Sequence, residues 1–166
     1  MWTVLGGSTM ACEFLNNEIQ TVALNAPILF DTSIPCSKGY VYHEGNTGNF
    51  ILKGANSTNN CNQFAQYQVT FNGNIAVPTG GTVPTGGIAI AITVNGEPRL
   101  TSRAIYVPAT AGDDYGNVTS TAIIKVPRCC CFSLSVDAVP ASADPTVTPA
   151  PSIAVQNANL TITRIA

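Results

Sequence analysis

The chain has 166 residues, of which only 10% are charged, and its formal net charge is −2. This length suits a single domain with a sizeable core. The weak charge gives no electrostatic basis for binding nucleic acid or an anionic membrane. No apolar run approaches the ~20 residues of a membrane-spanning helix, and the first residues lack the basic and apolar segments of a secretory signal peptide.

Neutral polar residues replace the missing charges, since the chain contains 15 Asn and 19 Thr. Thr favours strands and Asn favours turns. This composition is typical of an all-β structural or surface module and unusual for a helical enzyme. We therefore expect no enzymatic activity and no cofactor.

The first third of the chain contains short candidate elements. Residues 9–19 are the only helix candidate, with Thr9 as the N-cap candidate. Short β candidates and then a polar loop follow, at 26–35, 39–44, 49–54 and 55–62.

The stretch FAQYQVTFNGNIAVP (64–78) alternates as a strand does. Tyr67, Val69 and Phe71 share one face, which we expect to lie in the core. The opposite face, which we expect to point outward, carries Gln66, Gln68 and Thr70.

The remaining segments continue the β pattern. A Gly-rich loop (79–87) precedes IAIAITV (88–94), and the Asn95-Gly96 pair that follows is a strong hairpin signal. Two further strands, a Pro-rich loop and a closing strand follow, at 117–127, 130–139, 141–151 and 152–166. Eight to ten strands without helical intervals predict an antiparallel sandwich or barrel.

Three consecutive cysteines, Cys129 to Cys131, lead into the strand FSLSV. If that strand begins at Cys129, Cys130 shares the apolar face with Phe132 and Leu134 and is a core residue. Cys129 and Cys131 would then be ~7 Å apart, too far for a disulfide. A zinc site lacks the usual ligand spacing, and a disulfide such as Cys36–Cys61 is an open alternative; we favour packing.

No catalytic constellation is recognisable. His43 is the single histidine and stands beside turn residues, so we expect a solvated loop position. Asp113 and Asp114 could hold a cation, but two carboxylates among turn residues are usually only part of a loop. No nucleophile elbow, zinc-protease motif or phosphate loop occurs, and we expect no metal.

Five segments, in their order, resemble the tumour necrosis factor-like/complement-head jelly roll, and more closely its bacterial and phage branch: GNFILKG, QYQVTFNGNIAVP, IAIAITVNGEP, NVTSTAIIKVPRCCCFSLSV and NANLTITRIA. The resemblance covers residues 40–166. Arg128-Cys129 stand where the family usually has Gly-Asp. The resemblance implies an antiparallel jelly-roll sandwich of about 8–10 strands, formed by residues 26–166, that closes as a homotrimer.

The N-terminal residues 1–25 precede this domain, and we interpret them as an extended attachment arm. Its apolar residues have no place in the sandwich, and exposed apolar segments usually mark interaction sites. The candidate docking residues are Trp2, Leu5, Met10, Phe14 and Leu15. The start of the chain also resembles small structural proteins of phages that infect gut Firmicutes.

Two functions follow from this resemblance. The first is a virion structural protein, a trimeric head decoration or fibre tip, assembled in the host cytoplasm and bound through its arm to the major capsid or another virion protein. The alternative is an adhesin or lectin-like module on a bacterial cell or spore surface that binds glycans or proteins. The missing export signal favours the first function, and a host-surface glycan is a further candidate partner.

Several strands are uncharged on both faces, although an isolated sandwich needs only one buried face per sheet. Residues 88–94 and 121–124 show this pattern, which predicts a partner subunit. The outward residues that we expect to surround the trimer axis are Gln66, Gln68, Thr70, Thr119, Thr121 and Ile123.

Overall fold

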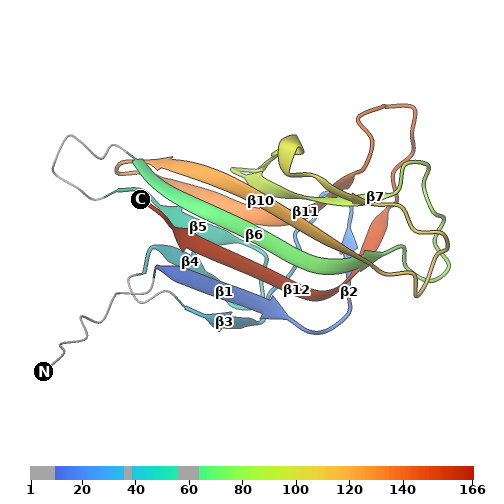
Figure 1. Cartoon of the computed structure of the whole chain (residues 1–166), viewed down its shortest axis with the longest axis horizontal. Helices are drawn as coiled ribbons and strands as arrows, with labels where there is room; N and C mark the ends of the chain where they lie inside the picture. The colour runs from blue at the N-terminus through green and yellow to red at the C-terminus, as the bar shows by residue number, and fades with distance from the viewer. Residues whose placement is uncertain (1–9, 36–38, 56–63) are drawn as a thin grey trace, which may run out of the picture.

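The computed structural model describes residues 10–35, 39–55 and 64–166, which form two antiparallel β-sheets packed face to face (Figure 1). One sheet has the order β10-β6-β12-β1-β3, and β2 also pairs with β12. We call it the long-stranded sheet. Its strands are β1 (Ala11–Asn16), β2 (Gln20–Ala23), β3 (Thr32–Ile34), β6 (Phe64–Ala76), β10 (Gly116–Pro127) and β12 (Ser152–Arg164).

The second sheet has the order β4-β5-β11-β7-β8, and β9 also pairs with β7. A short 3₁₀ turn, η1 (Leu100–Ser102), joins β8 to β9. The strands are β4 (Val41–His43), β5 (Phe50–Lys53), β7 (Ile88–Val94), β8 (Glu97–Pro98), β9 (Ala104–Tyr106) and β11 (Cys131–Pro140). Neighbouring strands are mostly distant in sequence, as the crossovers of a jelly roll require. The predicted all-β jelly-roll sandwich is confirmed.

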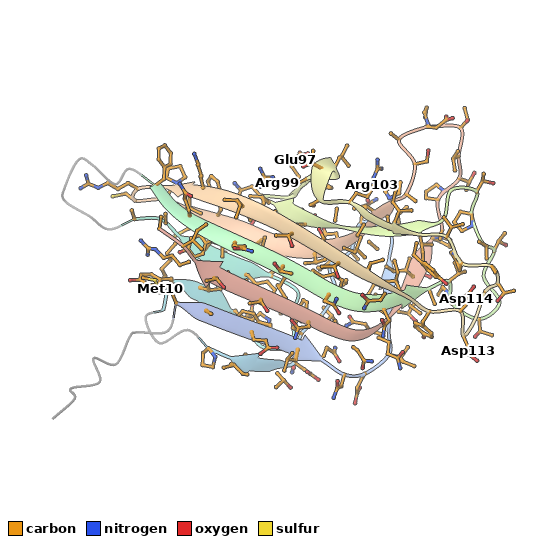
Figure 2. All side chains as sticks on the ribbon, in the orientation of Figure 1. Met10, Glu97, Arg99, Arg103, Asp113 and Asp114 are labelled. Atoms are coloured by element: carbon orange, nitrogen blue, oxygen red, sulfur yellow. The ribbon has the colours of Figure 1, made fainter. Side chains whose placement is uncertain are left out.

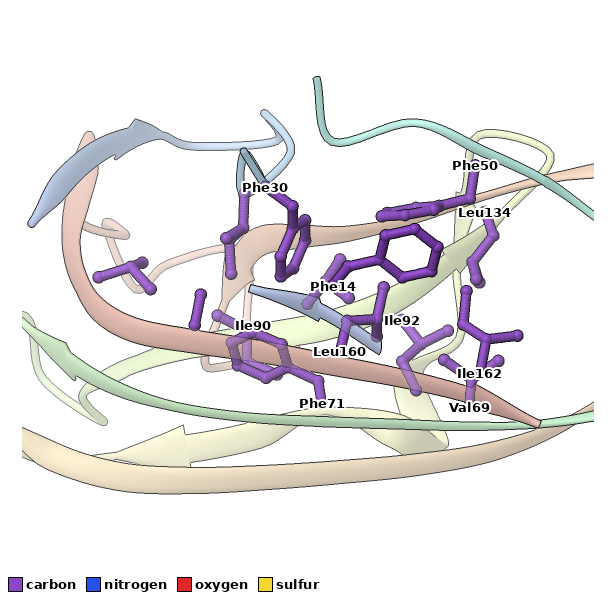
Figure 3. Packing of buried hydrophobic residues seen from close by; sticks show 14 of the residues in the cluster. Phe14, Phe30, Phe50, Val69, Phe71, Ile90, Ile92, Leu134, Leu160 and Ile162 are labelled. Atoms are coloured by element: carbon purple, nitrogen blue, oxygen red, sulfur yellow. The ribbon is translucent and has the colours of Figure 1, made fainter. Parts of the chain in front are cut away.

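The core lies between the two sheets (Figure 3). Tyr67, Val69 and Phe71 alternate inward from β6 and are fully buried. Leu134 of β11 is buried opposite them, while Phe132 is only half-buried at the margin of the core. Aromatic rings fill the β1 side, where Phe14 and Phe50 pack edge to face with their centroids 4.6 Å apart.

The Asn95-Gly96 turn joins β7 to β8, as its sequence predicts. Both residues have positive φ, 52° for Asn95 and 79° for Gly96. A type I′ hairpin turn requires this conformation at both central positions, and Asn and Gly adopt it most readily.

The described part of the predicted arm belongs largely to the sandwich, which corrects our division of the chain at residue 25. β1 pairs with β12 over its whole length and with β3, and the buried Phe14 joins the core. Leu15 is half-buried and Met10 is exposed. Trp2 and Leu5 lie outside the described residues.

The helix prediction for residues 9–19 was wrong because the inward residues of β1 recur every second position. Cys12 and Phe14 point into the core, whereas Glu13 and Leu15 point outward. This period of two is that of a strand, and pairing with β12 stabilises it.

The three cysteines also differ from our prediction, because β11 begins at Cys131 and the two preceding cysteines form the turn from β10. Cys129 has a φ of 58° and is exposed, while Cys130 is half-buried in the turn instead of lying in the core. The turn packs closely on Gly54, whose N–H donates to the Cys130 carbonyl at 2.8 Å. A Cβ on Gly54 would lie 1.9 Å from the Pro127 carbonyl oxygen, so this approach requires glycine. All three thiols are free.

The second face of β7 needs no partner subunit, contrary to our expectation. Ala89 and Ala91 are fully buried and Thr93 nearly so within the single chain. The two alanines form a small apolar cluster with Val139 and Ala141, separate from the main core. The argument for a partner therefore rests on the long-stranded sheet alone.

Candidate functional site: the outer face of the long-stranded sheet

The outer face of the long-stranded sheet, here called the polar face, is an array of almost exclusively neutral side chains. Each strand contributes every second residue, because the alternate residues point into the core. Its neutral members are Gln66, Gln68, Thr70, Asn72 and Asn74 from β6, Asn117, Thr119, Thr121 and Ile123 from β10, Asn159, Thr161 and Thr163 from β12, and Ala11 and Leu15 from β1; Glu13 of β1 and Lys125 of β10 share the same face.

The strand register arranges these residues in rows across the sheet. Thr121, Thr70 and Thr161 are direct neighbours in one row. The next row holds Ile123 beside Gln68, followed by Thr163. The structure thus brings all six residues of the expected trimer axis onto one surface: Gln66, Gln68, Thr70, Thr119, Thr121 and Ile123.

Sequence reasoning missed the part of this face that β12 and β1 supply. The alternation in NLTITR (159–164) carried the signal, since Asn159 and Thr161 stand between the buried residues Ala158, Leu160 and Ile162. Which strands flank β6 depends on the topology, however, and local alternation does not contain that information.

Hydrogen bonds between side chains order the polar face. The hydroxyls of Thr70 and Thr121 are 3.2 Å apart, and the Asn72 amide donates to Thr119 Oγ1 at 2.8 Å. Asn117 Nδ2 donates to Asn74 Oδ1 at 3.1 Å. These contacts restrict the rotamers before any partner binds, which lowers the entropy that association would cost.

Charge is almost absent from the polar face. Among its described residues only Glu13 and Lys125 are charged, and Lys125 lies toward one end of β10. Glu13 Oε1 accepts a hydrogen bond from Asn159 Nδ2 at 2.6 Å. Because neutral polar groups lose far less solvation energy on burial than charges do, this face can be covered by another protein surface.

The acidic loop after β9 has a structural role. The carboxylate of Asp114 accepts hydrogen bonds from the Tyr106 hydroxyl and the Ala109 N–H, both at 2.5 Å, and from the Thr110 N–H at 3.2 Å. The Tyr106 bond, followed by the two backbone bonds, lowers the pKa of Asp114. Within the described ranges, no group of three His, Cys, Asp or Glu side chains is placed to hold a metal.

His43 differs from its predicted position in a solvated loop. It lies in β4, half-buried, and its ring stacks on Phe50 with the centroids 4.5 Å apart. Nε2 is 3.0 Å from the Thr47 carbonyl oxygen. The ring therefore packs against the core and closes the 44–47 turn.

The cysteines give one further observation. Cys12 is buried in β1 and is disulfide-bonded. Cys36 and Cys61, the disulfide that we left open as an alternative, lie outside the described residues.

No family model and no curated protein matches the sequence. The comparisons that support the fold are therefore those with solved structures. The globular domain of zebrafish complement 1qA is similar over 95% of this chain and 98% of its own, with a TM-score of 0.57 and 11% identity. Eiger TNF from S. frugiperda is similar over 96% of this chain and 94% of its own, with a TM-score of 0.58 and 12% identity. The chain has a TNF-like jelly-roll fold.

The match to the zebrafish domain covers 95% of this chain, so it includes part of residues 1–25, which we had assigned to an arm. At 11–12% identity the comparison establishes the architecture and assigns no function to individual residues. The described residues contain no helix of the length and apolarity that crossing a membrane requires.

Proposed function

We propose that this chain is a homotrimeric, non-enzymatic display module whose polar face surrounds the threefold axis. The observation that carries the proposal is the almost uncharged outer face of the long-stranded sheet, which presents ordered Thr, Asn and Gln side chains. A permanently solvated sheet face usually carries charges. The number three comes from the resemblance to TNF-like and complement-head domains.

Subunits packed in this way bury a substantial area. Obligate interfaces bury ~2,000 Å² or more, and burial on this scale adds strongly to the stability of each subunit. The exposed aliphatic side chain of Ile123 lies at the β10 side of the polar face, with 44% of its surface accessible in the single chain. Burying it in a subunit contact removes apolar surface from water.

The biological role that we propose is that of a virion structural protein, a head decoration or fibre tip on the particle surface. In this role residues 1–9, including Trp2 and Leu5, attach the trimer to the major capsid or another virion protein. Deleting residues 1–9 should leave the sandwich folded and the trimer intact but abolish incorporation into particles. Normal incorporation of the shortened protein would contradict the attachment role.

One observation favours the alternative role on a bacterial cell or spore surface. Cys12 is disulfide-bonded, and disulfides persist mainly in oxidising surroundings outside the cytoplasm. A module exported to the cell surface meets this condition from the start, whereas a phage particle meets it only after leaving the cell. Neighbouring genes distinguish the two, namely capsid and portal genes for the virion role and a spore-coat or sortase locus for the alternative.

The trimer model is tested by placing a charge on the polar face. Ile123→Asp should shift the mass in light scattering from the trimer toward the 17.3 kDa of one chain, because like charges would enter a dry contact. Ile51→Asp is the matched control, since Ile51 points outward from β5 on the other sheet. A stable Ile123→Asp trimer would show that this face is not the interface.

A further inference from the structure

The two borders of the long-stranded sheet are formed by β10 and β3, on opposite sides of the sandwich (Figure 1). At the β10 border a cleft of about 450 Å³ has apolar walls that include Val94 and Phe132. Arg99 and Lys125 also line it, and Arg99 Nη1 donates to the Ile123 carbonyl oxygen at 2.7 Å. We call this surface the basic border.

The border next to β3 has the opposite charge. A cleft of about 430 Å³ is lined by Glu18 and Asp31 together with Leu15 and Thr32. The Asp31 N–H donates to the Leu15 carbonyl at 3.1 Å, which fixes the loop that carries this carboxylate beside β1. We call this surface the acidic border; no Lys or Arg side chain lines the cleft within the described part of the chain.

Exposed aliphatic side chains accompany both sets of charges. Strand β9 and η1 lie against β10, and Leu100, Ile105 and Ile123 are 59%, 49% and 44% exposed there. On the acidic side the corresponding residues are Ile19, Leu29 and Ile34, which are 60%, 44% and 56% exposed. Large aliphatic residues exposed in groups usually mark protein interaction surfaces.

We infer that the basic border of one copy docks on the acidic border of the next. Two different, complementary surfaces on opposite sides of one chain form head-to-tail contacts, and such contacts close into a ring when the rotation permits. A two-fold contact would instead place like charges together, which opposes association. The inference rests on the proposed trimer and names the surfaces that join its subunits.

The basic border keeps its positive charge although it contains one acidic residue, which supports docking on the acidic border of the next copy. Glu97 lies beside Arg99 on the hairpin next to η1 (Figure 2), so the basic border holds one acid against Arg99, Lys125 and the nearby Arg103. In a ring the polar face turns toward the axis while the two borders meet between neighbours. The aliphatic side chains then become buried, and the charges set which borders pair.

Charge reversal tests this pairing in the full chain. Arg99→Glu with Lys125→Glu should raise the concentration at which half the trimer dissociates by at least tenfold, and Glu18→Lys with Asp31→Lys should do the same. A chain with all four reversals should recover wild-type assembly, since each border again meets its opposite charge. Lys53→Glu, on the other sheet, is the matched control and should leave assembly unchanged.

A second measurement covers variants that fail to fold. Raising the salt concentration should promote dissociation of the wild-type trimer, because screening weakens the attraction between the borders. The inference would be overturned if salt did not affect the wild-type trimer and neither pair of reversals weakened assembly. It would also be overturned if the variant with all four reversals assembled no better than the two pairs. Either result would leave the proposed trimer itself intact. A wild-type mass of one chain would instead refute the proposed function itself.

Discussion

Replacing Tyr67 by Phe should destabilise the sandwich by removing one buried hydroxyl. The hydroxyl donates its one proton to the Lys53 carbonyl at 2.5 Å, which ties β6 to β5 of the opposite sheet, and the Tyr40 carbonyl oxygen lies 3.2 Å from the same hydroxyl. In the variant, the Tyr40 carbonyl oxygen still accepts a hydrogen bond from the Lys53 N–H. The Lys53 carbonyl oxygen, however, loses the hydrogen bond from the Tyr67 hydroxyl. Because this contact is part-buried, losing it should cost about 1 kcal/mol, the net contribution of a typical hydrogen bond, while the ring of Phe retains the packing.

The same variant should change the dependence of stability on pH. Burial in the core raises the pKa of Tyr67 above its ordinary value of 10.0, with the Arg164 charge opposing the shift. The folded state therefore holds the hydroxyl proton to higher pH than the unfolded state does. The stability of the wild type consequently falls as the pH rises above 10.0, the ordinary pKa of tyrosine. Tyr67→Phe should lack this alkaline loss.

Urea unfolding measures both effects, with an unchanged m-value showing that only stability changed. At neutral pH the thermal midpoint should fall by about 2–4 °C for each kcal/mol lost. Tyr42→Phe is the control, because Tyr42 is 59% exposed and should change little. A Tyr67→Phe protein as stable as wild type at neutral pH, with the same alkaline loss, would refute the role of this hydroxyl.

Four further predictions concern other parts of the chain. Burial raises the pKa of Asp137, so the free energy of unfolding of the wild type should fall as the pH rises above 3.8. Asp137→Asn should therefore be more stable than the wild type at neutral pH by ~1 kcal/mol. Urea midpoints that are equal at pH 3 and pH 7 in both proteins would contradict this prediction. Gly54→Ala should lower the thermal midpoint, because its Cβ would meet the Pro127 carbonyl; an unchanged midpoint would show that the turn can move. Deleting residues 1–20 should abolish the β circular dichroism spectrum, since β1 and the buried Phe14 are lost, and a folded product would contradict our assignment of β1 to the core. In the native protein a maleimide should modify Cys129 and Cys131 before the half-buried Cys130; the reverse order in peptide mass spectra would contradict the exposure of the turn.

The alternation of β6 and β10 was sufficient to predict the strands, their inward faces and their outward faces. Tyr67 and Val69 alternate with Gln68 over a long, unbroken stretch, and packing in the sandwich reinforces this period. Near the N-terminus the pattern is short, and the same residues satisfy a helix or a strand. Pairing with β12, which is distant in sequence, selects the strand.

The error at the cysteines has a similar cause. The alternation of Phe132 and Leu134 was extended backward by two residues, across a turn. That turn depends on the positive φ of Cys129 and on the close approach of Gly54, which directly follows β5 and is distant in sequence. Neither feature is visible in the local sequence.

The two charged borders could not be predicted for a topological reason. Glu18 and Asp31 precede Arg99 and Lys125 by many residues, and no local motif relates them. They become opposite borders of one sheet only because β3 and β10 end its strand order. Predicting this arrangement requires the strand order first.

The oligomeric mass of the wild-type protein tests the central claim most directly. Light scattering at micromolar concentration and moderate salt should give three times the 17.3 kDa of one chain. A mass of one chain under these conditions would contradict the account, because the polar face would then be an ordinary solvated surface.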